Sequence, residues 1–223
     1  MQEYLAKTLQ GLEGVLADEL KALGAKDIEI QRRAVSFKGD KKTLYKANFW
    51  LRTALRILKP VAVFKVNSPD DVYTEIKKLK LEEFINANKT FSIDTTVYSE
   101  QINHSRYVTY KAKDAIVDYF TEKYGKRPTV SVANPDIYFN LHISHTTCTL
   151  SLDSSGAPLF KRGYRVAQTD APINEVLAAG LLMLSGWKGQ CDFIEPMCGS
   201  GTIAIEAAMI ALNMAPGLFR KEF

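Results

Sequence analysis

The chain has 223 residues, of which 46% are apolar and 24% are charged. That balance excludes collagen, low-complexity disorder and coiled coil, and the length allows one to three domains. The net charge of +4 is uneven, because residues 1–165 carry 26 basic and 19 acidic side chains (+7) and residues 166–223 carry 3 and 6 (−3). A basic front and an acidic, apolar tail suggest two different roles.

The sequence predicts a cytoplasmic protein without membrane contact or bound metal. The N-terminus, Met1–Lys7, lacks the basic-then-apolar pattern of a signal peptide. The longest apolar run, Val176–Leu184, is far shorter than the ~20 residues of a spanning helix. Three cysteines, Cys148, Cys191 and Cys198, are an odd count without CxxC spacing, which indicates neither a disulfide framework nor a zinc site.

Apolar periodicity predicts a small α/β unit at the start of the chain. A strand at Tyr4–Leu9 precedes a helix whose apolar residues recur at helical spacing up to Leu23, with Gly24 placed to cap it. Two short strands follow, then a helix over Lys41–Asn48 and a strand within Arg52–Val66. The order β-α-β-β-α-β is typical of a ferredoxin-like unit.

A second α/β unit is predicted after the first. Helices are expected over Asp70–Lys80 and along the apolar stripe Val108–Phe120, which Gly125 closes. The stretch Phe91–Val97 alternates apolar and polar residues like a half-buried strand, and three more such strands are expected within residues 130–152.

The third segment has a different pattern. Asp170 is a suitable N-cap with Pro172 in the first turn, which predicts a helix extending to Leu184. A buried strand is expected at Asp192–Ile194, followed by a glycine-containing loop and an apolar helix over Ile203–Leu212. The segment therefore reads as helix, strand, glycine loop and helix.

The glycine loop is the most informative part of the sequence. Gly199 and Gly201 stand where the predicted strand turns into a helix, and glycine there permits positive φ and close approach of a ligand. A helix N-terminus offers N–H groups and partial positive charge, and such loops receive dinucleotides, nucleotides or S-adenosylmethionine. The spacing Gly199-x-Gly201-x-x-Ala204 also fits the dinucleotide fingerprint, and a tight turn without a ligand is the other alternative.

The full string Phe193–Ala208 resembles the first motif of class I S-adenosylmethionine-dependent methyltransferases, in the branch that modifies exocyclic amino groups of nucleic acid bases. In that family the loop wraps the methionine moiety of the cofactor. The stretch Ala171–Ala179 resembles the preceding helix, which helps close the cofactor pocket. The resemblance makes Cys198 a loop residue rather than a nucleophile. The residues that it implies for cofactor binding are Glu195, Pro196, Met197, Cys198, Gly199, Ser200, Gly201, Thr202, Pro172 and Asn174.

Three further motifs resemble the end of the THUMP domain in bacterial THUMP-containing rRNA methyltransferases: Asn134–Asp136, Ser151–Gly156 and Leu159–Arg165. The resemblance implies a ferredoxin-like unit at 1–66, a THUMP RNA-binding domain at 67–165 and the incomplete start of a Rossmann-like methyltransferase domain at 166–223. It also implies methylation of the N2 amino group of a guanine in large-subunit (23S) rRNA, with S-adenosylmethionine as the donor.

The candidate RNA contacts are basic residues with one aromatic ring among them. Tyr164 would stack on an unpaired base, and the cations would bind phosphates. For each Lys or Arg alone, a solvated surface position is the competing interpretation. The candidates are Arg106, Lys111, Lys113, Lys161, Arg162, Tyr164 and Arg165.

No catalytic residue can be assigned from this sequence. The family's catalytic motif, Asn or Asp followed by Pro-Pro-Tyr or Pro-Pro-Phe, is not found, and the nearest string, Ala133–Asp136, precedes the glycine loop. We therefore expect the chain to be the N-terminal part of a longer enzyme. The alternative is a non-catalytic RNA-binding module with a structural Rossmann-like stub.

Overall fold

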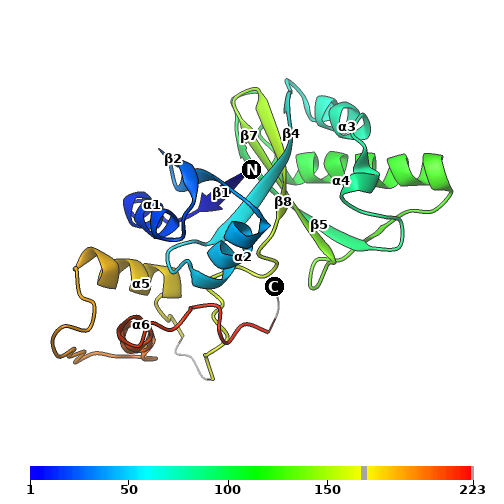
Figure 1. The fold of residues 1–223 in the computed structure, drawn as a ribbon. Coiled ribbons are helices and arrows are strands. Elements are labelled where there is room, and N and C mark those ends of the chain that lie inside the picture. The colour runs from blue at the N-terminus through cyan, green and yellow to red at the C-terminus, as the bar shows by residue number, and fades with distance from the viewer. Residues whose placement is uncertain (167–169, 222–223) are drawn as a thin grey trace. The chain divides into compact units, whose positions relative to one another are not determined.

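The computed structural model describes residues 1–166 and 170–221, which divide into two compact units (Figure 1). The first unit joins Met1–Leu58 to the chain from Ser154 onward, and the second consists of Lys59–Asp153. The two ends of the sequence therefore fold together, with the middle inserted between them. The domain boundaries at residues 66 and 165 stay a prediction.

The first unit contains the predicted strand and helix order. Its elements are β1 (Gln2–Lys7), α1 (Glu13–Ala22), β2 (Lys26–Gln31), β3 (Ala34–Gly39), α2 (Lys41–Trp50) and β4 (Arg56–Lys65). β1 lies between β3 and β4 and is antiparallel to both, and β2 pairs antiparallel with β3. This arrangement confirms the ferredoxin-like prediction. β4 continues past Leu58 into the second unit.

The core of this unit follows from alternation along the strands and helical spacing along α1. Tyr4 and Ala6 of β1 are fully buried, and the ring of Phe37 on β3 lies 5.5 Å from the ring of Tyr4. Leu16 and Leu20, four residues apart on α1, are buried in the same cluster. One helix face and one sheet face thus exclude water from each other.

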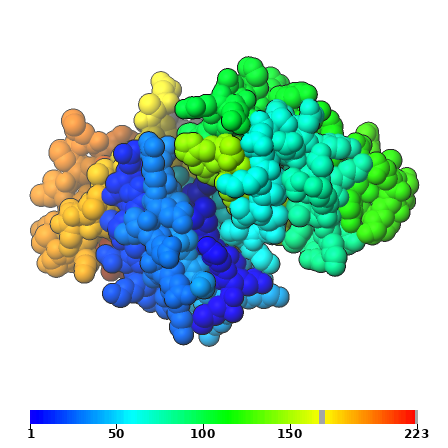
Figure 2. Space-filling view, turned by 90° about the horizontal axis from the view of Figure 1, so that it is seen from above, coloured from blue at the N-terminus to red at the C-terminus, as the bar shows by residue number. Residues whose placement is uncertain are grey.

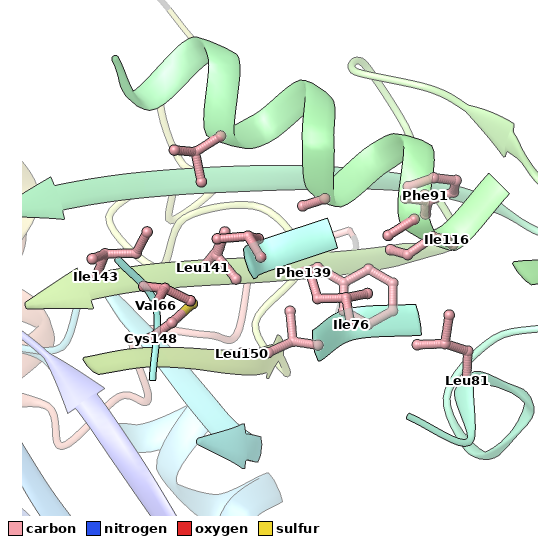
Figure 3. Close-up of a cluster of buried hydrophobic side chains, with 14 of the residues drawn as sticks. Val66, Ile76, Leu81, Phe91, Ile116, Phe139, Leu141, Ile143, Cys148 and Leu150 are labelled. Atoms are coloured by element: carbon pink, nitrogen blue, oxygen red, sulfur yellow. The ribbon is translucent and has the colours of Figure 1, made fainter. Parts of the chain in front are cut away.

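The second unit also matches its predicted pattern. Its elements are α3 (Pro69–Lys77), η1 (Leu81–Glu83), β5 (Thr90–Tyr98), α4 (Ser105–Tyr124), β6 (Thr129–Val130), β7 (Ile137–Ser144) and β8 (Thr147–Asp153). β5 is parallel to β6 and β7, and β7 is antiparallel to β8. In the core, the rings of Phe91 and Phe139 are 6.2 Å apart beneath α4 (Figure 3).

Helix α4 is 20 residues long and is buried along one face. Val108, Ala112 and Ile116 have no exposure, whereas Tyr107 and Tyr110 on the other face are exposed and Lys111 and Lys113 are half-buried. Gly125 ends the helix in the left-handed conformation, with φ +64°, as predicted. In the part of the chain that the structure describes, no helix is both long and apolar enough to cross a bilayer.

Helix α5 (Glu175–Leu184) begins later than predicted. Asn174, and not Asp170, is its N-cap, because the Asn174 side-chain oxygen accepts from two first-turn N–H groups at 2.9 and 3.3 Å. Asp and Asn are equally good caps, so composition alone does not choose between them. Pro172 accordingly lies before the helix and not within its first turn.

The segment Asp192–Ile194 is not a strand, which makes that prediction wrong. Ile194 is 84% exposed, and the ring of Phe193 lies 5.2 Å from the ring of Trp187. A strand needs a neighbour for its N–H and C=O groups, and no described segment pairs with this one. The helix after the glycine loop, α6 (Thr202–Ala211), forms as predicted.

Helix α5 lies close to the residues that precede α1. A Cβ atom added to Gly180 would lie 2.4 Å from Leu12 Cδ1, so a larger residue there would have to displace the Leu12 side chain. Figure 2 shows the N-terminal segment, in blue, beside the residues around α5, in orange. The C-terminal part of the chain is thereby packed against the ferredoxin-like elements of its own unit.

Candidate functional site

The glycine loop, residues 195–201, turns tightly into α6. Gly201 is the N-cap residue of α6, with φ +71°, and Gly199 has φ +54°. The Gly201 N–H donates to the carbonyl oxygen of Cys198 at 2.7 Å, which closes the turn. Both glycines occupy the left-handed region that other residues adopt at a cost, so the turn accounts for both.

Glu195, the first residue of the loop, forms a hydrogen bond with the first turn of α6. Its Oε2 accepts the backbone N–H of Ala204 at 3.0 Å, one of the N–H groups that a helix leaves without an intrahelical partner. A carboxylate at this position also complements the positive end of the helix. The structure thus gives Glu195 a capping contact, and its predicted cofactor contact stays a prediction.

The loop is open on one side. Among the described residues other than the chain neighbours, no heavy atom lies within 4 Å of a Cβ built on Gly199, and Ile205 Cδ1, at 3.9 Å, is the one atom near a Cβ built on Gly201. Met197 is 90% exposed, and Pro196 and Cys198 are exposed as well. A ligand can therefore approach the backbone of the loop without displacing packed side chains.

Arg165 of the linker contacts both the loop and the start of α5. Its Nε donates to Glu175 Oε1 at 2.5 Å, and its Nη2 donates to Thr202 Oγ1 at 3.1 Å. The same guanidinium donates to the carbonyl of Ile173, which lies between the predicted cofactor residues Pro172 and Asn174. Arg165 therefore links the segment that holds Pro172 and Asn174 to the start of α6, where the glycine loop ends.

Arg162 is placed differently from the prediction. It is only 2% exposed, and its Nε lies 3.4 Å from Oε1 of the fully buried Glu206 on α6. Its Nη1 and Nη2 donate to the carbonyls of Leu159 and Arg52 at 2.9 and 2.5 Å. The guanidinium is therefore engaged within the protein, and the predicted RNA contact of Arg162 stays a prediction without support from its burial.

Tyr164 shares the partner of Arg162. Its hydroxyl donates to Glu206 Oε1 at 3.0 Å, and burial beside this carboxyl raises the pKa of Tyr164. Burial also raises the pKa of Glu206, an effect larger than the opposite one of Arg162. The Tyr164 side chain is half-buried with its hydroxyl bound inside the fold, and its stacking on a base stays a prediction.

Sequence reasoning missed the buried polar network around α6. Arg52, after α2, donates through Nη2 to the carbonyls of Met209 and Met214 at 3.2 and 2.6 Å, at the carbonyl end of α6. Glu19 of α1 accepts the Arg52 N–H at 2.7 Å. The available signal was Glu206 itself, because a carboxylate within an apolar helix needs a buried partner.

The remaining RNA candidates lie on the surface. Arg106 and Lys113 of α4 lie 6.0 and 5.8 Å from the centre of the Tyr110 ring, which is 47% exposed. Lys111 lies 5.5 Å from the centre of the Tyr107 ring and 2.5 Å from an Asp70 oxygen. Lys161 is exposed as well. These four cations stay candidates for phosphate contact.

Metal ligation has no support in the described residues, where no three His, Cys, Asp or Glu side chains group together. The three cysteines are free thiols. Cys148 is buried in the second unit, and burial raises its pKa to about 12. Cys198 is exposed in the glycine loop, as expected of a loop residue.

Three family models match successive parts of the chain. They describe an RlmL ferredoxin-like domain at residues 3–58, a THUMP domain at 66–153 and an RMKL-like methyltransferase domain at 162–223. The matches follow the order of the ferredoxin-like elements, the second α/β unit and the glycine loop. They confirm a mixed α/β chain with ferredoxin-like, THUMP and methyltransferase-like parts.

Two relatives and one solved structure resemble the chain along nearly its whole length. It is 42% identical to the ribosomal RNA large subunit methyltransferase K/L of Syntrophotalea carbinolica and 40% identical to a putative RNA methyltransferase of Synechocystis. It spans 98% and 99% of its own residues in these comparisons, but 31% and 57% of the relatives. The solved structure is SMU.472, a putative methyltransferase complexed with SAH, with 31% identity, a TM-score of 0.85 and coverage of 99% of this chain and 58% of that one.

Proposed function

The chain belongs to the THUMP-containing methyltransferases, and on that premise we propose that it serves methyl transfer from S-adenosylmethionine to a base of large-subunit rRNA. The observation that carries the proposal is the open glycine loop at the N-terminus of α6, with positive φ at Gly199 and Gly201. Its opening leaves the backbone accessible to the cofactor. The large-subunit rRNA methyltransferase among the relatives supports the substrate class.

The residues present fit this cofactor. The backbone of residues 197–201 would hold the methionine moiety. Gly199 has no side chain to fill the open space beside the loop, so the ligand can approach the backbone there. Ser200 and Thr202 present hydroxyls that are 3.2 Å apart at the start of α6. S-adenosylmethionine supplies an electrophilic methyl group on a sulfonium centre, and the protein supplies binding and orientation.

We further propose the N2 amino group of a guanine as the methyl acceptor. The proposal rests on the likeness of Phe193–Ala208 to loops of enzymes that modify exocyclic amino groups. The RNA would be docked by the second unit, where Arg106, Lys111 and Lys113 alternate with two exposed tyrosines on α4. Cations bind phosphates, and the aromatic rings bind unpaired bases by stacking.

The experiment that tests the cofactor is calorimetric titration of the full-length gene product containing this sequence with S-adenosylhomocysteine. Saturable binding is expected, and Gly199→Val and Gly201→Val should abolish it, because both need positive φ and an open loop. A folded, unmutated protein that shows no binding would overturn the proposal.

The experiment that tests the acceptor is mapping of modified bases in rRNA from cells with and without the gene. Loss of one N2-methylguanine in large-subunit rRNA is the expected result. Loss of a methyl group at another base position would keep the methyltransferase and correct its specificity. The rival function, a non-catalytic RNA-binding module, predicts no lost methyl group and no cofactor binding.

A further inference from the structure

Arg165 is the side chain that joins the linker, the start of α5 and the glycine loop. Its Nε donates to Glu175 Oε1 at 2.5 Å, and its Nη2 donates to the carbonyl of Ile173 at 2.8 Å and to Thr202 Oγ1 at 3.1 Å. Its Nη1 donates to Ser200 Oγ at 3.3 Å. Four hydrogen bonds from one guanidinium thus reach two segments that are far apart in sequence.

The loop has two restraints besides Arg165, the Gly201 N–H bond to the Cys198 carbonyl and the Glu195 bond to the Ala204 N–H. Neither holds the Ser200 side chain, and residues 196–199 are exposed. Glycines have the widest choice of backbone conformations, so an unpacked loop with two of them is expected to sample many. Ser200, the residue between the glycines, is held by Arg165 and by the hydroxyl of Thr202.

These contacts also argue against a role of Arg165 in binding RNA. A guanidinium has five N–H donors, and four of them are engaged within the protein. Its charge faces the carboxylate of Glu175, which is itself buried. A phosphate would have to displace a buried ion pair, whereas exposed Lys161 is available without that cost.

We propose that Arg165 is a positioning residue that holds the glycine loop in the shape that binds the cofactor. This inference rests on the proposed function, because it assigns a support to that same site. A loop that is already ordered loses less conformational entropy when a ligand binds, so the support raises affinity without touching the ligand. Thr202 and Ser200 transmit the restraint to the two glycines beside them.

The test compares Arg165→Lys with Lys161→Ala in the full-length gene product. Lysine keeps the charge but cannot make four directed contacts, so the dissociation constant for S-adenosylhomocysteine should rise about tenfold or more. Turnover at saturating S-adenosylmethionine should stay within about twofold, because a positioning residue does not contact the reacting atoms. Lys161→Ala, a neighbouring exposed change, should leave the dissociation constant for S-adenosylhomocysteine unchanged.

Hydrogen exchange supplies a readout without cofactor. In Arg165→Lys, amides of residues 197–203 should exchange faster while those of α4 stay unchanged. Thr202→Val removes the contacts of one hydroxyl with Arg165 and Ser200 but keeps the other three Arg165 contacts. It should therefore give a smaller change in the same loop, which covers the case that the arginine variant folds poorly. Faster exchange in both variants, with weaker cofactor binding, would support the inference.

The two proposals fail in different ways. If the unmutated protein binds S-adenosylhomocysteine and Arg165→Lys binds it equally well, the positioning role is overturned and the methyltransferase proposal stands. If the unmutated protein does not bind it, the proposed function fails and the positioning role fails with it. Equal loss of affinity for RNA and cofactor in Arg165→Lys would indicate general destabilisation and also overturn the inference.

Discussion

Arg162 Nε lies 3.4 Å from Glu206 Oε1, and the two side chains are 2% and 0% exposed. This pair ties the linker after β8 to helix α6. Together with the Arg165 contacts, it means that two of the three cations in the linker serve the interior of the first unit. Lys161 is the exposed member of this group.

The first prediction concerns the stability that this pair supplies. Arg162→Ala should lower the free energy of unfolding by about 3–5 kcal/mol, because it removes one of the two arginines near the buried Glu206 and leaves the carbonyls of Leu159 and Arg52 without this donor. Lys161→Ala should change it by less than about 0.5 kcal/mol, as exposed substitutions do. Urea unfolding of the two variants measures the difference. Equal small losses would show that the buried pair contributes nothing net.

A second prediction uses the pH dependence of the same carboxyl. Burial raises the pKa of Glu206 in the folded state, so the folded protein holds this proton more tightly than the unfolded chain. Stability that comes from this proton is therefore lost as pH rises from about 4.3 through the raised folded-state value. Glu206→Gln does not titrate, so it should gain stability relative to the unmutated protein across that window.

Urea unfolding of both proteins at several pH values checks this sign. The free energy of unfolding of Glu206→Gln minus that of the unmutated protein should increase as pH rises. It should become constant above the folded-state pKa of Glu206. If this difference decreased as pH rises, the two nearby arginines, Arg162 and Arg52, would lower the folded-state pKa of Glu206 by more than burial raises it.

Most of the fold could be predicted because its signals are local. Helical spacing placed the helix around Leu16 and Leu20, and strand alternation placed β5 and β7. Asp192–Ile194 was misread because an apolar run does not reveal whether a neighbouring strand exists to pair with it. The start of α5 was misread because two good capping residues, Asp170 and Asn174, lie four positions apart.

The candidate site was predictable in part for a related reason. The glycine loop is recognised by spacing, since its conformation depends on its own glycines. The roles of Arg162 and Arg165 depend on contacts with Glu206 and Glu175, which follow them by 44 and 10 residues. A count of charges treats Arg162, Arg165 and Lys161 alike. The difference between them is burial, which the sequence does not show.

The third prediction separates backbone strain from loss of cofactor. Gly199 and Gly125 have φ of +54° and +64°, and neither has atoms near a built Cβ. Alanine at either position should therefore cost a similar ~1–2 kcal/mol. Only Gly199→Ala should weaken S-adenosylhomocysteine binding, because Gly125 ends α4 in the other unit. Thermal unfolding and calorimetric titration measure the two effects. Equal affinity of the two variants for S-adenosylhomocysteine would mean that the loop around Gly199 does not bind the cofactor.

The last prediction concerns the outward face of α4. Arg106 and Lys113 flank the exposed ring of Tyr110, and the nearby Asp114 binds Lys113 at 2.8 Å without enclosing it. Each cation that binds a phosphate releases counterions, so Arg106→Ala and Lys113→Ala should each weaken RNA binding and reduce its salt slope by about 1. Tyr110→Ala should weaken binding without changing the slope, because stacking carries no charge.

Lys123 on the same helix is the matched control. It also lies over tyrosine rings, 5.2 Å from Tyr119 and 5.6 Å from Tyr124, but its ammonium binds Glu82 at 2.6 Å. The contact with Glu82, and after it the one with the Tyr119 hydroxyl, raise the pKa of Lys123, so its ammonium has two side-chain partners on the protein. Lys123→Ala should therefore leave RNA affinity and its salt slope unchanged in fluorescence anisotropy at several salt concentrations. If all three lysine and arginine variants reduce the slope equally, the interaction follows the general charge of α4 and not the cluster around Tyr110.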